Sequence, residues 1–179
     1  VSTADGVSIA LKQAINDGSI RGPRLWVAGA AIGPTGGHSD PATGVREEFA
    51  EAANDDLGAL DGPDAFRHAV RLRHRQGADL IKLMIGGGVT SLRDNPKLRL
   101  MDDDEIKAAI DTAHSLGMKI TTHSHSAAAT NAALRFGIDA IEHGTYGDAE
   151  SYRLMKAQNV FLVPTLSAGL AGVKYMDDN

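Results

Sequence analysis

Lysine and histidine side chains lie where consecutive predicted strands of this sequence end. Lys82 lies in the apolar run DLIKLMIGGG. Farther along the chain, His123 and His125 form an H-x-H, and His143 closes the segment DAIEH. Imidazole nitrogens bind zinc-like ions, and the carboxyl ends of parallel strands build the sites of α/β proteins. A lone strand-end histidine is more often a hydrogen-bonded structural residue, but this combination predicts a shared metal site.

Lys82 stands out because an ammonium group loses its hydration when it enters an apolar core. Burial lowers the pKa of a lysine and so favours the neutral amine. A neutral amine can react with carbon dioxide to form a carbamate, a carboxylate that can bridge two cations. The sequence therefore predicts either that Lys82 extends out of the core or that it becomes an anionic ligand at the strand's end.

The remaining four histidines divide into two groups. His38 lies in the loop TGGHSD that follows the predicted strand 24–31, so it joins the strand-end set. His68, His74 and His114 lie on helical patterns, where we interpret them as surface or packing residues without a functional role.

The elements that must position these residues alternate between helix and strand. The hydrophobic spacing predicts helices over 7–18, 63–76, 102–116, 126–136 and 148–158. It predicts strands over 24–31, 79–85, 118–123, 139–143 and 160–163. Asp102 with Glu105 resembles a capping box, and Gly117 is a plausible helix stop. This alternation predicts an α/β fold with parallel strands: either an open sheet or part of a (β/α)8 barrel, which needs about 250 residues.

Composition predicts one globular domain over 1–179. The chain has 179 residues, of which 42% are hydrophobic, and a net charge of −5, which argues against a nucleic-acid partner. The absence of cysteine excludes disulfides and thiolate metal sites and fits a cytoplasmic location. No apolar run approaches the ~20 residues of a membrane helix, and no signal-peptide pattern is present. Because the first residue is Val1, we expect a processed or partial chain.

Five stretches together resemble the amidohydrolase superfamily, and more narrowly its imidazolonepropionase-related, prolidase-like branch. They are GPRLWVAGAAIGPTGGHSD, DLIKLMIGGGVTS, ITTHSHSAAA, DAIEHGTY and VFLVPTL. The resemblance implies a distorted TIM-like (β/α)8 barrel with one or two divalent metals, usually zinc. The five predicted strands would then be strands three to seven of eight.

The resemblance also implies roles for individual residues. Lys82 would be the carboxylated ligand that bridges two metals, and His123 and His143 would bind the second metal. We prefer His123 to His125 because the strand reaches it first, although both point to the same side by strand alternation. His125 would then contact substrate. The other candidate substrate contacts are His38 and Tyr146.

Two parts of the family pattern have no counterpart in this sequence. The first is the strand-one H-x-H that binds the first metal, and the second is the strand-eight aspartate that acts as general base. Asp177 and Asp178 lie in what reads as a polar tail without a preceding apolar strand. We therefore expect weak or absent activity from this chain alone, and a homo-oligomer or association with missing barrel segments that covers its exposed sheet edges.

The implied reaction is hydrolysis of an amide C–N bond by metal-activated water. The implied substrates are Xaa-Pro dipeptides or N-acyl amino acids, with a cyclic amide as an alternative. The residues alone also allow a non-catalytic α/β module in which GGG at 86–88 binds phosphate through backbone amides. A third possibility is an inactive fragment of a longer enzyme.

Overall fold

Four parallel strands form the central sheet of this chain. The computed structural model describes residues 6–46, 59–89, 91 and 93–177. The strands are β3 Leu80–Met84, β4 Lys119–Ser126, β5 Ala140–Tyr146 and β6 Phe161–Val163. They pair in the order β3-β4-β5-β6, and every pairing is parallel. The register aligns Met84 with His123 and His123 with Glu142, so these residues lie side by side across the sheet.

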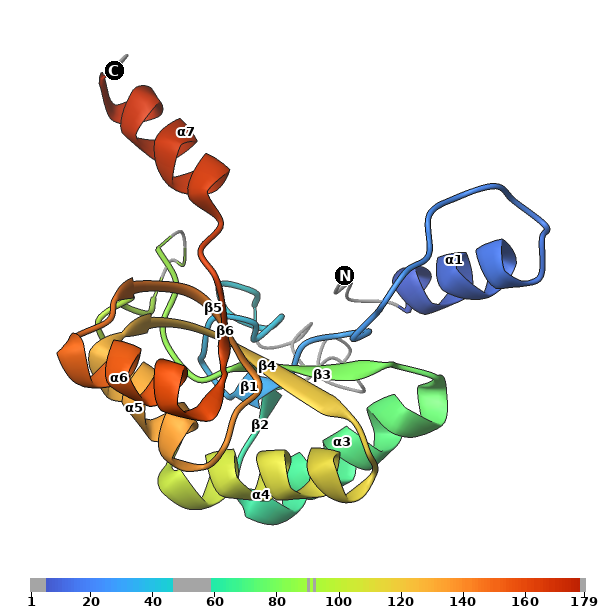
Figure 1. The fold of residues 1–179 in the computed structure, drawn as a ribbon, viewed down its shortest axis with the longest axis horizontal. Helices are drawn as coiled ribbons and strands as arrows, with labels where there is room; N and C mark the ends of the chain where they lie inside the picture. Colours follow the sequence, from blue (N-terminus) through green and yellow to red (C-terminus); the bar gives the residue numbers. More distant parts are fainter. Residues whose placement is uncertain (1–5, 47–58, 90, 92, 178–179) are drawn as a thin grey trace.

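Helices cover one face of this sheet (Figure 1). They are α3 Pro63–Gln76, α4 Asp103–Ser115, α5 Ala127–Arg135 and α6 Ala149–Gln158. Ile81, Leu83, Ile120 and Ile141 alternate along the strands with the polar residues and are at most 1% exposed. Their burial forms the hydrophobic core, and the prediction of an α/β fold with parallel strands is confirmed.

The structure confirms the sequence signals for the start and the end of α4. Asp102 and Glu105 form a complete capping box at the start of α4. Gly117, just past the end of this helix, has a φ of 71°, which a glycine adopts without steric cost. Asp148 and Ser151 make a second capping box at the start of α6, which the sequence reading did not identify.

The predicted strand 24–31 is wrong as a regular strand. Within the segment Gly29 forms an isolated bridge; Ile32, just past it, bridges to Leu83, and β1, Gly33–Pro34, then pairs with β2, Ala59–Leu60. The Val27 carbonyl accepts the Asp79 N–H at 2.8 Å, but side chains bind other backbone groups of the segment. The Val27 N–H donates to Asp79, and Arg73 donates to the Ala30 carbonyl. The segment therefore runs beside β3 without forming a ladder.

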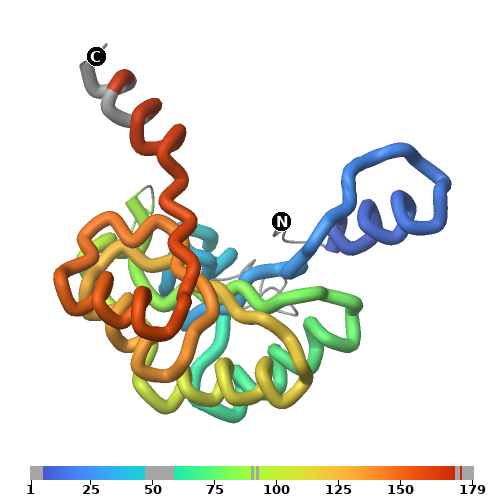
Figure 2. Tube along the Cα trace, viewed as in Figure 1, coloured from blue at the N-terminus to red at the C-terminus, as the bar shows by residue number. Residues whose placement is uncertain are grey.

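Two helices extend from the sheet at opposite ends of the chain (Figures 1 and 2). Helix α1, Val7–Asn16, was predicted, and its Lys12 ammonium binds Asp79 at 3.0 Å. Helix α7, Leu166–Asp177, was not predicted. The expectation of a polar tail is wrong for Asp177, which ends this helix, while Asp178 lies outside the described residues. None of the described helices is long and apolar enough to cross a membrane.

Apolar side chains stay exposed along the last strand and the helix that follows it. Phe161 is 74% exposed and Val163 is 47% exposed, although both lie in β6. Leu166 and Leu170 of α7 are at least 70% exposed. Within the described part of the chain, strand β6 has a paired neighbour on one side only. The edge formed by β6 is therefore open to further packing.

Candidate functional site

Four imidazole rings meet near the carboxyl ends of β4 and β5. His123, His125 and His143 each offer a ligand atom, and these atoms lie within 4.8 Å of one another. The His38 ring stacks on His123 with 4.2 Å between ring centroids. The expectation that His123 and His125 share one side of their strand is confirmed by 4.8 Å between their rings. We refer to these four residues as the imidazole cluster.

The backbone of β5 departs from regular geometry at the cluster. Adjacent strand residues normally point to opposite faces. His143, however, has a φ of 71°, and Gly144 follows with 63°. As a result the Glu142 carboxylate reaches Lys82 while the neighbouring His143 ring reaches His123. A register shift between Ser124 and Ser126 bends β4 at the same level.

Hydrogen bonds fix the orientation of three of the rings. His123 donates from Nε2 to the Gly87 carbonyl at 3.0 Å, because a carbonyl can only accept. Its Nδ1 therefore keeps a free lone pair in the neutral ring. His125 Nδ1 lies 2.9 Å from the Thr145 hydroxyl, and His143 Nδ1 lies 2.6 Å from the Thr165 hydroxyl.

Burial keeps the imidazole cluster neutral. It lowers the pKa of His123 to about 3, although the hydrogen bond to Gly87 opposes the shift. Burial likewise lowers the pKa of His143 to about 4, with the neighbouring His125 adding a smaller effect. The pKa values of His38 and His125 are also lowered by burial. Uncharged rings have the lone pairs that metal coordination requires.

Lys82 lies next to the cluster and does not extend into solvent. Its side chain is 8% exposed and forms an ion pair with the Glu142 carboxylate. Thr121 adds a 3.3 Å hydrogen bond to the same carboxylate. Burial lowers the pKa of Lys82 to about 8, although the carboxylate favours the ammonium form. The sequence reading missed Glu142, which the motif IEHG and the parallel register could have identified.

The glycine loop after β3 makes room for the chain's own groups. A Cβ at Gly88 would overlap the His38 ring, and a Cβ at Gly87 would overlap the Asn95 backbone. The Gly87 N–H donates to the Leu98 carbonyl, and the Gly88 N–H donates to Asp94. Because internal acceptors already take these two amides, the alternative of a phosphate-binding GGG loop loses its physical basis.

Tyr146 lies at the end of β5, outside the imidazole cluster. It is 46% exposed, and the Lys97 ammonium lies 5.6 Å from its ring centroid. A tyrosine in this setting is available to a ligand that approaches from solvent.

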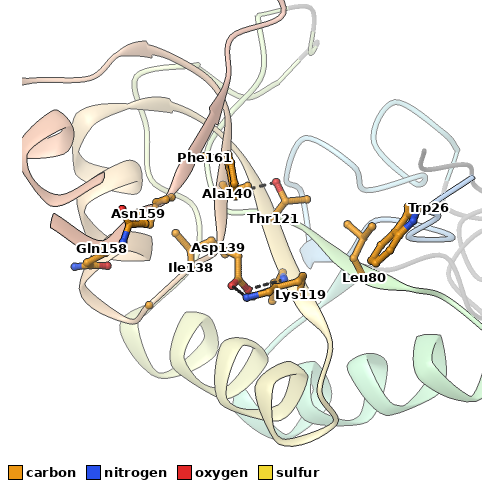
Figure 3. Close-up of a pocket in the computed structure, with 13 residues that line it drawn as sticks. Trp26, Leu80, Lys119, Thr121, Ile138, Asp139, Ala140, Gln158, Asn159 and Phe161 are labelled. Carbon is orange, nitrogen blue, oxygen red and sulfur yellow. Dashed lines mark hydrogen bonds and ion pairs between the residues drawn. The ribbon is translucent and has the colours of Figure 1, made fainter. Parts of the chain in front are cut away.

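A cavity of about 510 Å³ lies at the opposite end of the sheet (Figure 3). Leu80, Thr121 and Phe161, at or near the amino ends of their strands, line it, together with Trp26. Lys119 and Asp139 form an ion pair at its rim. In parallel α/β folds the chemistry gathers at the carboxyl ends of the strands, so we assign the site to the imidazole cluster.

The chain belongs to the Amidohydrolase family, whose model matches residues 2–178. It is 34% identical over 180 residues to the ochratoxinase of Aspergillus niger, an alignment that covers 90% of this chain and 36% of that protein. The chain therefore spans about a third of the length of this curated relative.

Solved structures of similar proteins superpose on most of this chain. A Xaa-Pro dipeptidase with bound methionine superposes with a TM-score of 0.90 at 37% identity, covering 94% of this chain and 42% of that one. The A. niger ochratoxinase superposes with a TM-score of 0.86 at 31% identity, covering 96% of this chain and 43% of the ochratoxinase. A prolidase in complex with N-methylphosphonate-L-proline superposes with a TM-score of 0.81 at 33% identity. The match covers 93% of this chain and 42% of the prolidase.

Proposed function

We propose that this chain contributes metal-binding residues to an enzyme that hydrolyses an amide C–N bond in a small substrate. The observation that carries the proposal is the convergence of the imidazole cluster with Lys82 at the carboxyl ends of adjacent parallel strands. Family membership and the likeness to a Xaa-Pro dipeptidase and an ochratoxinase support amide hydrolysis. Within that class we propose Xaa-Pro dipeptides or N-acyl amino acids as substrates.

The donor set fits a divalent metal such as zinc. His123 and His143 offer neutral nitrogens, and hydroxyl or carbonyl groups hold their rings. When bound, the metal would supply an acidified water and polarise the substrate carbonyl. We assign His123 and His143 as ligands. His125 lies within the same 4.8 Å group, and we assign it to substrate contact together with His38 and Tyr146.

Lys82 has the properties that carboxylation requires. Burial lowers its pKa to about 8, so roughly a tenth of the amine is neutral at pH 7, far more than for an exposed lysine. Carbon dioxide would add to that amine and release a proton, leaving a carbamate as a bridging ligand. The new negative charge would lie beside Glu142, so the present ion pair would have to separate and Glu142 would need a cation between it and the carbamate.

Metal content is the direct test. After purification with zinc we expect about one metal per chain in the wild type, because the residues that would hold a first metal have no counterpart in its sequence. The variant His123→Ala, His143→Ala should lose it, whereas His68→Ala, an exposed change on α3, should retain it. A wild-type chain without zinc, or a double variant that keeps it, would contradict the proposal.

Turnover is the second test. We expect the isolated chain to hydrolyse alanyl-proline far below the ~1–10³ s⁻¹ typical of enzymes, because the residues that would hold a first metal and act as general base have no counterpart in its sequence. Ordinary turnover by the purified chain, measured by release of proline, would show that its own residues are sufficient.

A further inference from the structure

A smaller cavity, of about 250 Å³, lies on the side of His38 away from the three other rings, none of which lines it. His38, Ser91, Asp40 and Asp94 contribute to its walls. Among the described residues that line it, two are carboxylates and none is a lysine or arginine. The cavity therefore has negative character.

Asp94 brings an unsatisfied charge to this cavity. Its side chain is only 3% exposed, and its Oδ1 accepts a hydrogen bond from the Gly88 N–H at 3.0 Å. Its Oδ2 is buried and has no hydrogen-bond partner within the described part of the chain. A buried charged acceptor without a partner is costly, so native proteins seldom keep one without a ligand or a function.

The neighbouring groups do not supply the missing donor. His38 Nδ1 lies 3.9 Å from Asp94 Oδ2, beyond hydrogen-bond range, and is occupied by the Ser91 hydroxyl at 2.5 Å. The other carboxylate, that of Asp40, already accepts the N–H groups of Gly36 and Ala42.

An organic cation fits this site better than a metal ion does. Hard cations need several oxygen ligands around one point. Within the described ranges, the only group of three or more potential metal ligands is His123, His125 and His143. An ammonium group needs only a few acceptors, and a single buried carboxylate gives it a strong charge-assisted hydrogen bond.

We propose that the Asp94 cavity binds a primary ammonium group that the substrate carries several bonds away from the amide cleaved at the imidazole cluster. His38 connects the two places: its ring stacks 4.2 Å from His123, and its Nδ1 lies 3.9 Å from Asp94. The assignment to a substrate rests on the proposed function. Ammonium binding as such does not, because it needs no metal.

Ammonium binding is tested on the metal-free wild-type chain by following backbone amide signals in NMR titrations. We expect n-butylammonium to shift the signals of Gly36, Gly37 and Gly88. Tetramethylammonium has the charge without N–H donors and should bind more weakly, and neutral n-butanol should cause no shifts. Absent shifts, or shifts confined to other regions, would overturn the proposal without the need for any variant.

A matched pair of variants adds a quantitative test. Asp94→Asn should weaken n-butylammonium binding at least about tenfold, since a charged hydrogen bond is lost. Asp64→Asn removes the same charge from a side chain that is 97% exposed and should leave the affinity unchanged. Equal affinity in wild type and Asp94→Asn would overturn the proposal.

The source of the ammonium is tested with two dipeptides on the zinc-loaded chain. Lysyl-proline should bind more tightly than norleucyl-proline, and Asp94→Asn should remove the difference. If both bind equally while n-butylammonium still binds, the cavity holds a free amine and the substrate assignment is wrong. A chain that takes up no zinc would refute the proposed function, whereas the metal-free titration would still report on the cavity.

Discussion

His143 holds its imidazole through a backbone conformation that residues other than glycine seldom adopt. Its φ of 71° costs roughly 1–2 kcal/mol, as left-handed conformations do for residues with a Cβ. Thr165, whose hydroxyl holds the His143 ring, also has a positive φ, of 49°. Strained residues that contact each other in a site are typical of functional geometry.

The threonines that hold the rings allow His143 on β5, an assigned ligand, to be told apart from His125 on β4. Thr165→Val keeps the branched shape and removes the hydrogen bond to His143, so we expect zinc affinity to fall about 10–100-fold. Thr145→Val removes the equivalent bond to His125 and should change the affinity much less. The measurement is competition with a zinc chelator. A large loss in Thr145→Val would make His125 a ligand.

Neutral buried histidines make stability depend on pH. The pKa of His123 is about 3 in the folded chain and about 6.5 when unfolded, so between these values only the unfolded state binds the proton. The free energy of unfolding should fall as pH drops through this window, by about 1.4 kcal/mol per unit for this group. Urea midpoints between pH 7 and 4.5, measured with a chelator present, report the slope.

His123→Asn should make that slope shallower, because it removes one titrating ring while His143, whose pKa burial lowers to about 4, still titrates. His68→Asn, an exposed change on α3, serves as the control and should leave the slope as it is. Equal slopes in wild type and His123→Asn would mean that burial of this ring does not govern the acid sensitivity.

Gly88 makes the position of His38 possible. In Gly88→Ala the new methyl group would overlap the His38 ring, so we expect the ring to move and stability to fall by about 1–3 kcal/mol. Gly86→Ala is the matched control, because its Cβ would lie 3.5 Å from the nearest atoms, an ordinary contact. NMR signals of the His38 ring and urea unfolding measure both effects. An unmoved ring would contradict this steric account.

At the scale of elements, the sequence predicted those whose signals are local. The capping box of α4 and the apolar strands β3 to β6 could be located from neighbouring residues. The segment 24–31 was mispredicted as a regular strand because the distant side chains of Asp79 and Arg73 bind part of its backbone in place of a strand ladder. Helix α7 was missed because Gly169 and Gly172 weaken its helical pattern.

Part of the site could likewise be predicted from the sequence. Period-two alternation and strand ends indicated His123, His125 and His143. The ion pair of Lys82 with Glu142 depends on the exact register of three strands and on the positive φ of His143. Neither can be read from one strand at a time, so this partner was not foreseen.

Glu105 connects two helices and should be sensitive to substitution. One of its oxygens accepts the Gly62 N–H before α3, and the other accepts the Asp102 N–H at the start of α4. Glu105→Ala leaves both donors unsatisfied, and we expect a loss of about 2 kcal/mol in urea unfolding. Asp111→Ala breaks only an exposed pair with Lys107 and should cost less than about 1 kcal/mol. Similar losses would contradict the connecting role.

At the scale of the whole molecule, the exposed apolar groups of β6 and α7 need a partner. We propose that other barrel segments or further copies of the chain cover them, because open sheet edges and exposed apolar faces favour association. The likeness to structures of which this chain covers 42–43% is consistent with missing neighbours at this edge.

This proposal predicts concentration-dependent association of the isolated chain. Phe161→Lys places a charge at a position that is 74% exposed, so it should reduce association while leaving the fold intact. Lys156→Ala, a change on the exposed side of α6, is the control. Sedimentation velocity over a range of concentrations measures both. A wild-type chain that stays monomeric throughout would refute cover by further copies of the chain.

The order of the strands has a consequence for how the chain acquires its structure. Each strand of the main sheet pairs with the one that follows it in sequence, and a single helical crossover separates them. Each pairing therefore joins residues that a whole helical crossover separates along the chain, and forming such parallel pairs is intrinsically slow. During synthesis, each strand that emerges would meet a preceding strand already in place. The rings of His123 and His143 would therefore come together only when β5 docks.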